Sequence, residues 1–287
     1  MILAGGLLRC GSMGAQSGHP GNGFSDPAMV ESIPVRIYRD FVVVAQGSLG
    51  GGRERLNFVL DTGTAPSIIN KTVVERLERL ATNKSSVNTM GKAVVSQSAV
   101  VAEVDLGPIR AISLPVQIQD LGRLERDLGI AVAGIIGLDV LSKCDFRLDY
   151  RNKSLTFGNS PENGIPVPLD PRSGIAVAQA TLNGKPVRML VDTGSDRVIL
   201  LGEGLKGKDG PASRKMLQEP LSAADPARGV RVLFASRIAL GARQFTLEKA
   251  YFLPGADGAF DGVLGVRALG FGAIAYRRAS RALYLQN

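Results

Sequence analysis

The residues in this chain with the clearest chemical potential are two copies of Asp-Thr-Gly, each followed by a hydroxyl residue. The first copy comprises Asp61, Thr62, Gly63 and Thr64, and it follows the apolar residues 58–60. The second comprises Asp192, Thr193, Gly194 and Ser195, and it follows the apolar residues 189–191. An isolated Asp-Thr-Gly is more often a turn or a helix cap than a reactive site. Two copies in matched contexts indicate a paired function.

Two carboxylates that lie close together cannot both ionise easily, so the pair holds one proton over a range of pH. The ionised member can take a proton from water while the protonated member donates to a carbonyl oxygen. The apolar residues before each aspartate predict a buried strand that holds the carboxylate rigidly. Gly63 and Gly194 allow a tight turn that brings N–H groups close to the carboxylates. Such donors stabilise the ionised form.

Both motifs belong to a longer internal repeat. Ile-Pro-Val occurs at residues 33–35 and again at 165–167, at nearly the same distance before each motif. Gly-Ile-Ile-Gly at 134–137 has a counterpart in Gly-Val-Leu-Gly at 262–265. Each half closes with a hairpin-like stretch. Landmarks in the same order indicate duplication and predict two lobes in one chain, with Gly137 and Gly265 as packing positions.

Short β-rich runs bounded by turn residues predict a mostly β protein. The expected strands include residues 41–45, 57–60, 100–105, 175–180, 187–191 and 230–240. Helical spacing is limited to residues 71–81, 121–128 and 138–143. Hairpin turns are expected at residues 50–52 and at Asn183-Gly184. We predict a leader or disordered segment over residues 1–26, a first lobe over 27–158, a polar linker over 159–164 and a second lobe over 165–287.

The net charge of +8 arises from 34 basic and 26 acidic residues that are scattered along the chain. Nucleic-acid binding would require a concentrated basic stripe with interleaved aromatics, and aromatics make up only 5% here. A solvated basic surface is the simpler interpretation, and a weak attraction to anionic membranes stays open. Without an apolar run of 18 residues, no membrane-spanning helix is expected.

Other catalytic chemistries find little support. His19 is the only histidine and lies near the N-terminus, which argues against Ser-His-Asp or Cys-His catalysis and against a histidine-ligated metal. Cys10 and Cys144 are too few for a disulfide framework, and Cys144 is expected to be a buried small residue. Residues 202–209 imitate a phosphate loop, but Asp209 replaces the hydroxyl residue that binds magnesium. We therefore expect no metal and no cofactor.

The N-terminal segment is compatible with export. Residues 1–8 are apolar and residues 11–18 are small and polar, as at the end of a secretion signal. Residues 7–11 faintly resemble a lipoprotein cleavage box, although Arg9 stands where that box has a small residue. The alternative is a disordered N-terminus through Asp26. A periplasmic, secreted or lipid-anchored location is slightly favoured over a cytoplasmic one.

From Ile33 to the C-terminus the chain resembles a bacterial member of the aspartic protease superfamily, which includes retropepsins and pepsins. The resemblance implies two pseudo-twofold-related, closed, barrel-like lobes with few short helices. It implies an aspartic endopeptidase that acts on peptide or protein substrates. It also implies a monomer whose two lobes pair in cis. Asp61 and Asp192 would be the catalytic residues, facing one another across the lobe interface.

The resemblance also assigns supporting roles. Thr62 and Thr193 resemble threonines whose hydroxyls bond to the opposite loop, and Thr64 and Ser195 would donate to the outer carboxylate oxygens. A hairpin flap is expected over residues 87–101, and a second over 217–234. The first flap tip contains Thr89, Met90 and Gly91, a glycine-bearing tip that resembles retropepsins more than pepsins. Either stretch could instead be an ordinary surface hairpin.

Two alternatives stay open. The same fold could serve as a catalytically weak peptide-binding or regulatory module, although both copies keep their aspartate, threonine and glycine. Each lobe could also dimerise with a partner chain. The short linker and the similar size of the lobes favour pairing within one chain.

Overall fold

The computed structural model describes residues 24–25, 30–76, 82–89, 92–158, 162–201, 218–220, 229–253 and 259–287. Strands dominate this part of the chain. The helices in it are short: α1 (Lys71–Arg76), α2 (Gly122–Leu128), α3 (Leu138–Leu141) and the 3-10 helix η2 (Arg267–Leu269). The predicted mostly β fold with two closed, barrel-like lobes and few helices is confirmed.

The first lobe is built on a nine-stranded sheet. Consecutive pairing closes part of it into a ring of β4 (Val42–Leu49), β5 (Leu56–Leu60), β10 (Gly134–Ile136), β6 (Ile68–Asn70), β9 (Arg110–Gln119) and β8 (Lys92–Asp105). β7 (Thr82–Thr89) extends β8 into a long hairpin, while β1 (Phe24–Ser25) and β3 (Arg36–Tyr38) pair with β9 and β4. Ring closure leaves the ring strands without a free edge.

The second lobe has a seven-stranded sheet with the same pairing order. Its ring consists of β14 (Val177–Leu182), β15 (Lys185–Asp192), β20 (Gly262–Gly265), β16 (Val198–Leu201), β19 (Arg243–Leu253) and β18 (Gly229–Leu240). β17 (Gln218–Pro220) extends β18 as β7 extends β8. Parallel and antiparallel pairs follow the same order in both rings, so β5 and β15 occupy equivalent positions.

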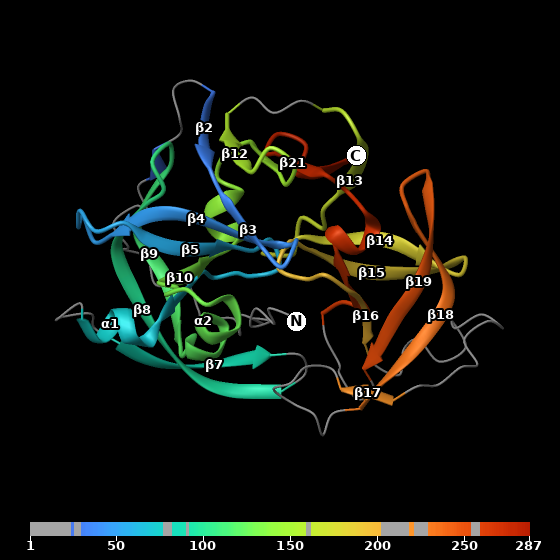
Figure 1. Cartoon of the computed structure of the whole chain (residues 1–287), viewed down its shortest axis with the longest axis horizontal. Coiled ribbons are helices and arrows are strands. Elements are labelled where there is room, and N and C mark those ends of the chain that lie inside the picture. Colours follow the sequence, from blue (N-terminus) through green and yellow to red (C-terminus); the bar gives the residue numbers. More distant parts are fainter. Residues whose placement is uncertain are drawn as a thin grey trace.

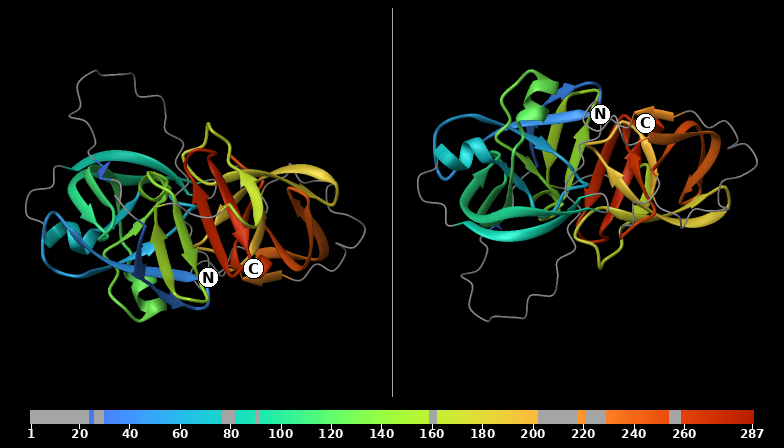
Figure 2. Two further views of the ribbon diagram at one scale, coloured as in Figure 1. Left: turned by 90° about the horizontal axis from the view of Figure 1, so that it is seen from above. Right: turned by 90° about the horizontal axis from the view of Figure 1, so that it is seen from below.

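A six-stranded sheet joins the lobes. Its order is β13 (Ile165–Pro168), β22 (Ala282–Gln286), β21 (Ala273–Arg277), β11 (Phe146–Asp149), β12 (Ser154–Phe157) and β2 (Glu31–Pro34). The first three strands come from the second half of the chain and the last three from the first half. They lie between the two lobes in Figure 1, and Figure 2 shows the lobes side by side. The central strands β21 and β11 pair antiparallel, with Leu148 opposite Ile274.

The predicted hairpin turns occur as expected. Asn183 and Gly184 connect β14 to β15 with φ values of 49° and 81°, and Leu182 pairs with Lys185 across the turn. Two successive positive φ values are the signature of a type I′ turn, which Asn-Gly adopts readily. Gly50 and Gly51, with φ values of 63° and 74°, turn the chain between β4 and β5.

Helix α2 packs on the outside of the first ring. Leu124 and Leu128 are buried in a cluster with Val44, Val59 and Ile135, which come from β4, β5 and β10. Because β5 leads into the first Asp-Thr-Gly loop and β10 pairs with β5, this packing stabilises the strands that position the loop.

Several sequence predictions fall outside the described residues: the N-terminal segment around His19, the phosphate-loop look-alike at 202–209 and, within the second flap candidate, residues 217 and 221–228. The lobe and linker boundaries stay predictions. Cys144 is buried, as expected. None of the helices among the described residues is long and apolar enough to cross a membrane.

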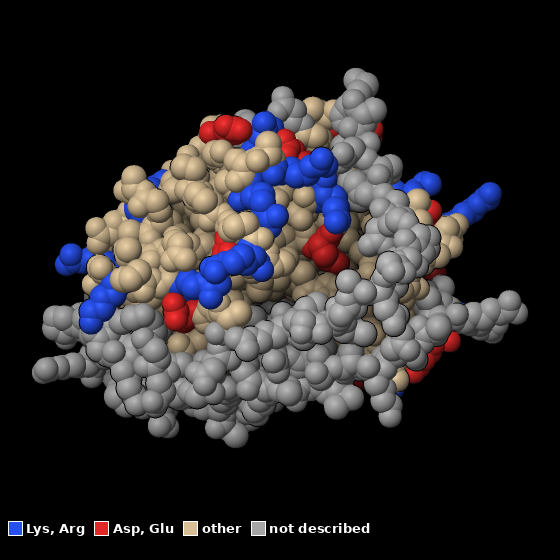
Figure 3. All heavy atoms as spheres, turned by 180° about the vertical axis from the view of Figure 1, so that it is seen from behind, with Lys and Arg blue, Asp and Glu red and all other residues tan. Residues whose placement is uncertain are grey.

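Charged side chains of both signs are interspersed on the face shown in Figure 3. Arg277 pairs with Asp145 at 2.6 Å and with Glu162 at 3.2 Å, and Arg188 pairs with Asp170 at 3.2 Å. The Arg277 and Asp170 side chains are only 19% and 9% exposed, so these pairs are partly buried. They offset part of the positive charge of the chain locally.

Candidate active site

The two motif aspartates lie at equivalent ends of equivalent strands. β5 ends immediately before Asp61, and β15 ends at Asp192. Each strand pairs in parallel with the glycine-bearing strand of its own lobe, β5 with β10 and β15 with β20. The N–H of Asp61 donates to the carbonyl of Ile136 at 3.0 Å, and the carbonyl of Asp192 accepts from the N–H of Val266 at 3.1 Å. Two buried strands therefore hold each loop.

Thr62 and Thr193 form a reciprocal lock between the lobes. The N–H of Thr62 donates to Oγ1 of Thr193 at 3.1 Å, and the N–H of Thr193 donates to Oγ1 of Thr62 at 3.2 Å. The Thr62 hydroxyl donates to the carbonyl of Val191 at 2.8 Å, and the Thr193 hydroxyl donates to that of Leu60 at 3.2 Å. Both threonines are buried, so all four bonds are shielded from water.

The glycines of the motifs bring the two carboxylates together. A Cβ at Gly63 would lie 3.0 Å from Cγ of Asp192, and a Cβ at Gly194 would lie 2.9 Å from Oδ2 of Asp61. Each loop thus contacts the carboxylate of the other lobe at a point where a side chain would not fit. Gly63 N–H donates to Oδ1 of Asp61 at 2.7 Å, and Gly194 N–H donates to Oδ1 of Asp192 at 2.6 Å.

The fourth position of the motif differs between the lobes. The Thr64 hydroxyl donates to Oδ2 of Asp61 at 2.9 Å, as expected. The Ser195 hydroxyl instead donates to the carbonyl of Arg197 at 3.2 Å and accepts from the Arg197 N–H at 3.2 Å. The structure thus differs from the expectation that Ser195 serves Asp192. A physical reason lies two residues on, because the first lobe has Pro66 at the position of Arg197, and proline has no N–H to attract the hydroxyl.

Burial raises the pKa of both aspartates, because Asp61 is fully buried and Asp192 is 3% exposed. For Asp61 this is partly offset by hydrogen bonds from Asp192, Gly63 and Thr64. The pKa of Asp192 is raised further by the negative charge of Asp61 and by their mutual hydrogen bond, with the Gly194 N–H acting against this. The two groups titrate as a pair.

Gly137 and Gly265 serve packing, as predicted from the repeat. A Cβ at Gly137 would collide with the carbonyl oxygen of Thr64, and one at Gly265 would lie 2.5 Å from that of Ser195. The N–H of Leu138 donates to the same Thr64 carbonyl at 2.8 Å. The strand that leads to Gly137 and the strand that ends at Gly265 therefore support the motif loops from behind.

Sequence reasoning missed a polar network beside the first loop. Asp139, in the first turn of α3, accepts hydrogen bonds from the N–H of Ser67 at 2.9 Å and from its hydroxyl at 2.8 Å. The Ser67 hydroxyl in turn accepts from the N–H of Gly137 at 2.9 Å. Burial raises the pKa of Asp139, against the effect of the Ser67 donors. Its signal in the sequence was an acidic residue in the first turn of a predicted helix.

The first flap candidate forms a hairpin. β7 and β8 pair antiparallel, and Thr89 lies opposite Lys92. Met90 and Gly91 lie outside the described residues, so their place relative to the aspartates stays a prediction.

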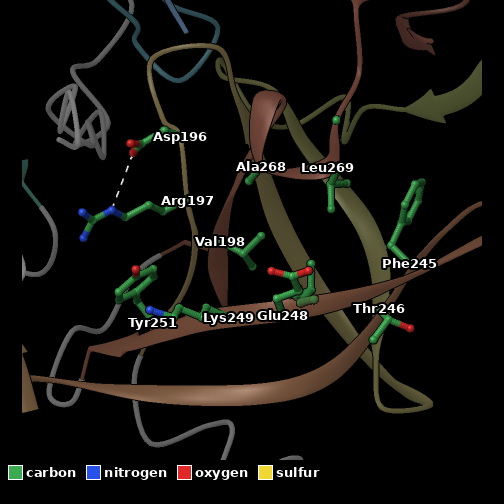
Figure 4. Close-up of a pocket in the computed structure, with 12 residues that line it drawn as sticks. Asp196, Arg197, Val198, Phe245, Thr246, Glu248, Lys249, Tyr251, Ala268 and Leu269 are labelled. Carbon is green, nitrogen blue, oxygen red and sulfur yellow. Dashed lines mark ion pairs between the residues drawn. The ribbon is translucent and has the colours of Figure 1, made fainter. Parts of the chain in front are cut away.

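A pocket of about 660 Å³ lies beside the second loop (Figure 4). It is lined by Asp196, Arg197 and Val198, by residues 245–249 and Tyr251 of β19, and by residues 268–270. The Arg197 guanidinium lies 4.6 Å from the centre of the Tyr251 ring and 3.7 Å from Asp196. No group of three or more His, Cys, Asp or Glu side chains suited to a metal ion occurs in the described part of the chain.

The family model described as aspartyl protease matches the chain in two tandem regions, residues 45–140 and 178–268. Each region contains one Asp-Thr-Gly loop and the glycine-bearing strand that supports it. The chain therefore belongs to the aspartyl protease family and carries two lobes of this kind. No curated protein matches the chain.

Proposed function

We propose that the protein is an aspartic endopeptidase that hydrolyses peptide bonds through Asp61 and Asp192. The observation that carries the proposal is the pairing of two buried carboxylates by reciprocal threonine hydrogen bonds across the lobe interface. Such a pair can hold one proton between two oxygens, which is the requirement for activating water without a metal or a nucleophilic side chain.

In the proposed reaction, water adds to the carbonyl carbon of a peptide bond. The ionised carboxylate accepts a proton from this water while the protonated carboxylate gives its proton to the carbonyl oxygen. The product is a tetrahedral diol without a covalent bond to the enzyme. As the diol collapses and the C–N bond breaks, the carboxyl that took the water proton gives it to the leaving nitrogen. The other carboxylate takes a proton from a diol hydroxyl as the carbonyl re-forms, so the dyad finishes with the single proton it began with.

The first test is cleavage by the variants Asp61→Asn and Asp192→Asn. Each should lower kcat for a peptide substrate by about 1,000-fold or more between pH 3 and 7, because one half of the acid–base pair is lost. Asp127→Asn is the matched control, since Asp127 lies on α2 and pairs only loosely with Arg123, at 3.9 Å. Unchanged cleavage by either dyad variant would exclude the proposed mechanism.

Binding of a statine-type transition-state mimic distinguishes an active endopeptidase from a peptide-binding module with the same fold. An active dyad should bind this inhibitor far more tightly than it binds substrate. A folded protein that neither binds the inhibitor nor cleaves denatured protein at any pH from about 3 to 7 would favour the peptide-binding alternative.

We further propose that the lobes pair within one chain. Three strands from each half form the joining sheet, and the threonine lock connects loops 131 residues apart. Light scattering of the purified protein should then give the mass of one 30.3 kDa chain. A stable dimer would instead support lobe exchange between chains.

A further inference from the structure

We propose that the two halves of the site are unequal: Thr64 stabilises Asp61 as the base that activates water, and the shared proton resides on Asp192, which acts as the acid. This inference rests on the proposed function. It assigns a positioning role to Thr64, and it assigns no such role to Ser195, the counterpart of Thr64 in the repeat.

The hydrogen bonds on the two carboxylates carry the argument. Asp61 accepts from the N–H of Gly63 at 2.7 Å and from the hydroxyl of Thr64 at 2.9 Å, with one bond on each oxygen. Outside the dyad itself, the hydrogen bond that Asp192 accepts from the described residues is that of the Gly194 N–H, at 2.6 Å. Donors directed at a carboxylate stabilise its ionised form, so the carboxylate with the additional donor holds the negative charge more readily.

The difference is fixed by the backbone two residues beyond each hydroxyl. The Arg197 N–H donates to Ser195, and the Ser195 hydroxyl hydrogen points to the Arg197 carbonyl. At the equivalent position Pro66 offers no N–H, which leaves the Thr64 hydroxyl to Asp61. Arg197 is held in place by its contacts with Tyr251 and Asp196 (Figure 4).

Packing also fixes the position of Thr64. Its side chain is fully buried, and its carbonyl accepts the N–H of Leu138 at 2.8 Å. A buried hydroxyl that already donates to a carboxylate cannot turn to solvent, so the bond to Asp61 persists. Burial and the adjacent Asp61 charge raise the pKa of Asp192, which agrees with a proton held there.

Two other ionisable groups act on this region from the joining sheet and from η2. The Tyr150 phenol is buried, which raises its pKa, and the charges of Arg267, Asp192 and Asp61 also act on it. The Arg267 guanidinium lies 5.3 Å from the centre of the Tyr150 ring. Tyr150 and Arg267 are present in the variants of both Thr64 and Ser195. Their effect on the pKa values of the dyad is therefore the same in the two variants and cancels in the comparison.

The test compares Thr64→Ala with Ser195→Ala in the full-length protein. In Thr64→Ala the acidic midpoint of the pH profile of kcat/KM should move up by about one pH unit, because a hydrogen bond to the ionised Asp61 is lost. In Ser195→Ala that midpoint should stay within about 0.2 pH units, a small fraction of the shift expected from such a bond. Thr64→Ser keeps the hydroxyl and should restore the original midpoint. Equal shifts in both alanine variants, or a shift only in Ser195→Ala, would overturn the inference.

A second measurement is independent of turnover. Carboxyl-labelled aspartates can be titrated by carbon NMR, with the two dyad signals assigned through Asp61→Asn and Asp192→Asn. The signal of Asp61 should titrate first, and Thr64→Ala should move that titration upward. If the protein shows this order but cleaves nothing, the proposed function fails while the inequality stands. If it cleaves peptides and Asp192 titrates first, the inference alone is rejected.

Discussion

Thr62 and Thr193 connect the two lobes through four buried hydrogen bonds. Each hydroxyl both donates to a carbonyl and accepts from an N–H of the other lobe. Removing one hydroxyl therefore leaves two buried backbone groups without partners, and such groups are costly to leave unpaired.

We expect Thr62→Ala to lower the free energy of unfolding by about 2–4 kcal/mol, from two unpaired buried groups at about 1–2 kcal/mol each. The double variant with Thr193→Ala should lose less than the sum of the single variants, because the two residues share one network. Denaturant unfolding followed by circular dichroism measures both values. Thr156→Ala is the control, since its hydroxyl bonds to Ser32 on an exposed surface. If Thr62→Ala lowers the free energy of unfolding no more than Thr156→Ala does, the reciprocal threonine hydrogen bonds do not stabilise the pairing of the lobes.

Asp192 should make stability depend on pH. Its folded-state pKa is raised above the ordinary 3.8, so the folded protein keeps a proton that the unfolded chain releases. The resulting stability is complete below 3.8 and is lost as pH rises through the folded pKa. Asp192→Asn cannot ionise, so its Tm should exceed that of the parent by about 2–4 °C at pH 7, where each kcal/mol corresponds to such a shift. Thermal melts of both proteins from pH 4 to 7 test this. If the difference in Tm between them does not change with pH, ionisation of Asp192 does not destabilise the folded protein.

The sequence was sufficient for the paired aspartates, threonines and glycines, because identical short motifs imply identical loops. It was not sufficient for Ser195. A serine hydroxyl chooses among nearby acceptors, and the competing Arg197 backbone is seen only once the loop geometry is known. The bonds of Asp139 with Ser67 were likewise hidden, since 72 residues separate the partners.

At the scale of elements, the glycine-bearing strands β10 and β20 support the motif loops from behind. Gly137→Ala should destabilise the protein by about 1–3 kcal/mol, because the new methyl group meets the Thr64 carbonyl in a packed interior. It should also lower kcat by displacing the Asp61 loop. Gly174→Ala is the control, since no atom lies within 4 Å of its added Cβ. Unfolding curves and kinetics of both variants test this, and a harmless Gly137→Ala would exclude a supporting role.

Prediction of elements succeeded where local signals agreed and failed where they conflicted. The Asn-Gly turn and the strands before both aspartates were predicted correctly, and α2 was placed to within one residue. β9 was missed because Pro115 interrupts it, although this proline pairs opposite Val100 within the sheet. β8 proved much longer than the predicted residues 100–105, since its first half is polar.

At the scale of the whole molecule, the joining sheet carries the association of the lobes. Leu148 and Ile274 face each other at its centre and are 3% and 0% exposed. Leu148→Ala should lower the free energy of unfolding by about 2–5 kcal/mol, as expected for deletion of buried methyl groups. Val100→Ala, at a position 52% exposed, is the control for loss of side-chain volume. If the two variants unfold at the same denaturant concentration, the centre of the sheet does not hold the lobes together.

The same sheet implies that the covalent connection between the halves is dispensable once folding is complete. The first half contributes twelve strand residues to this sheet, in β11, β12 and β2, and β11 pairs directly with β21 of the second half. The chain passes from one half to the other between β12 and β13. A protease nick between Phe157 and Ile165 would therefore leave two fragments that migrate as one particle under native conditions. The peptide link would then serve chiefly to supply the two halves in equal number.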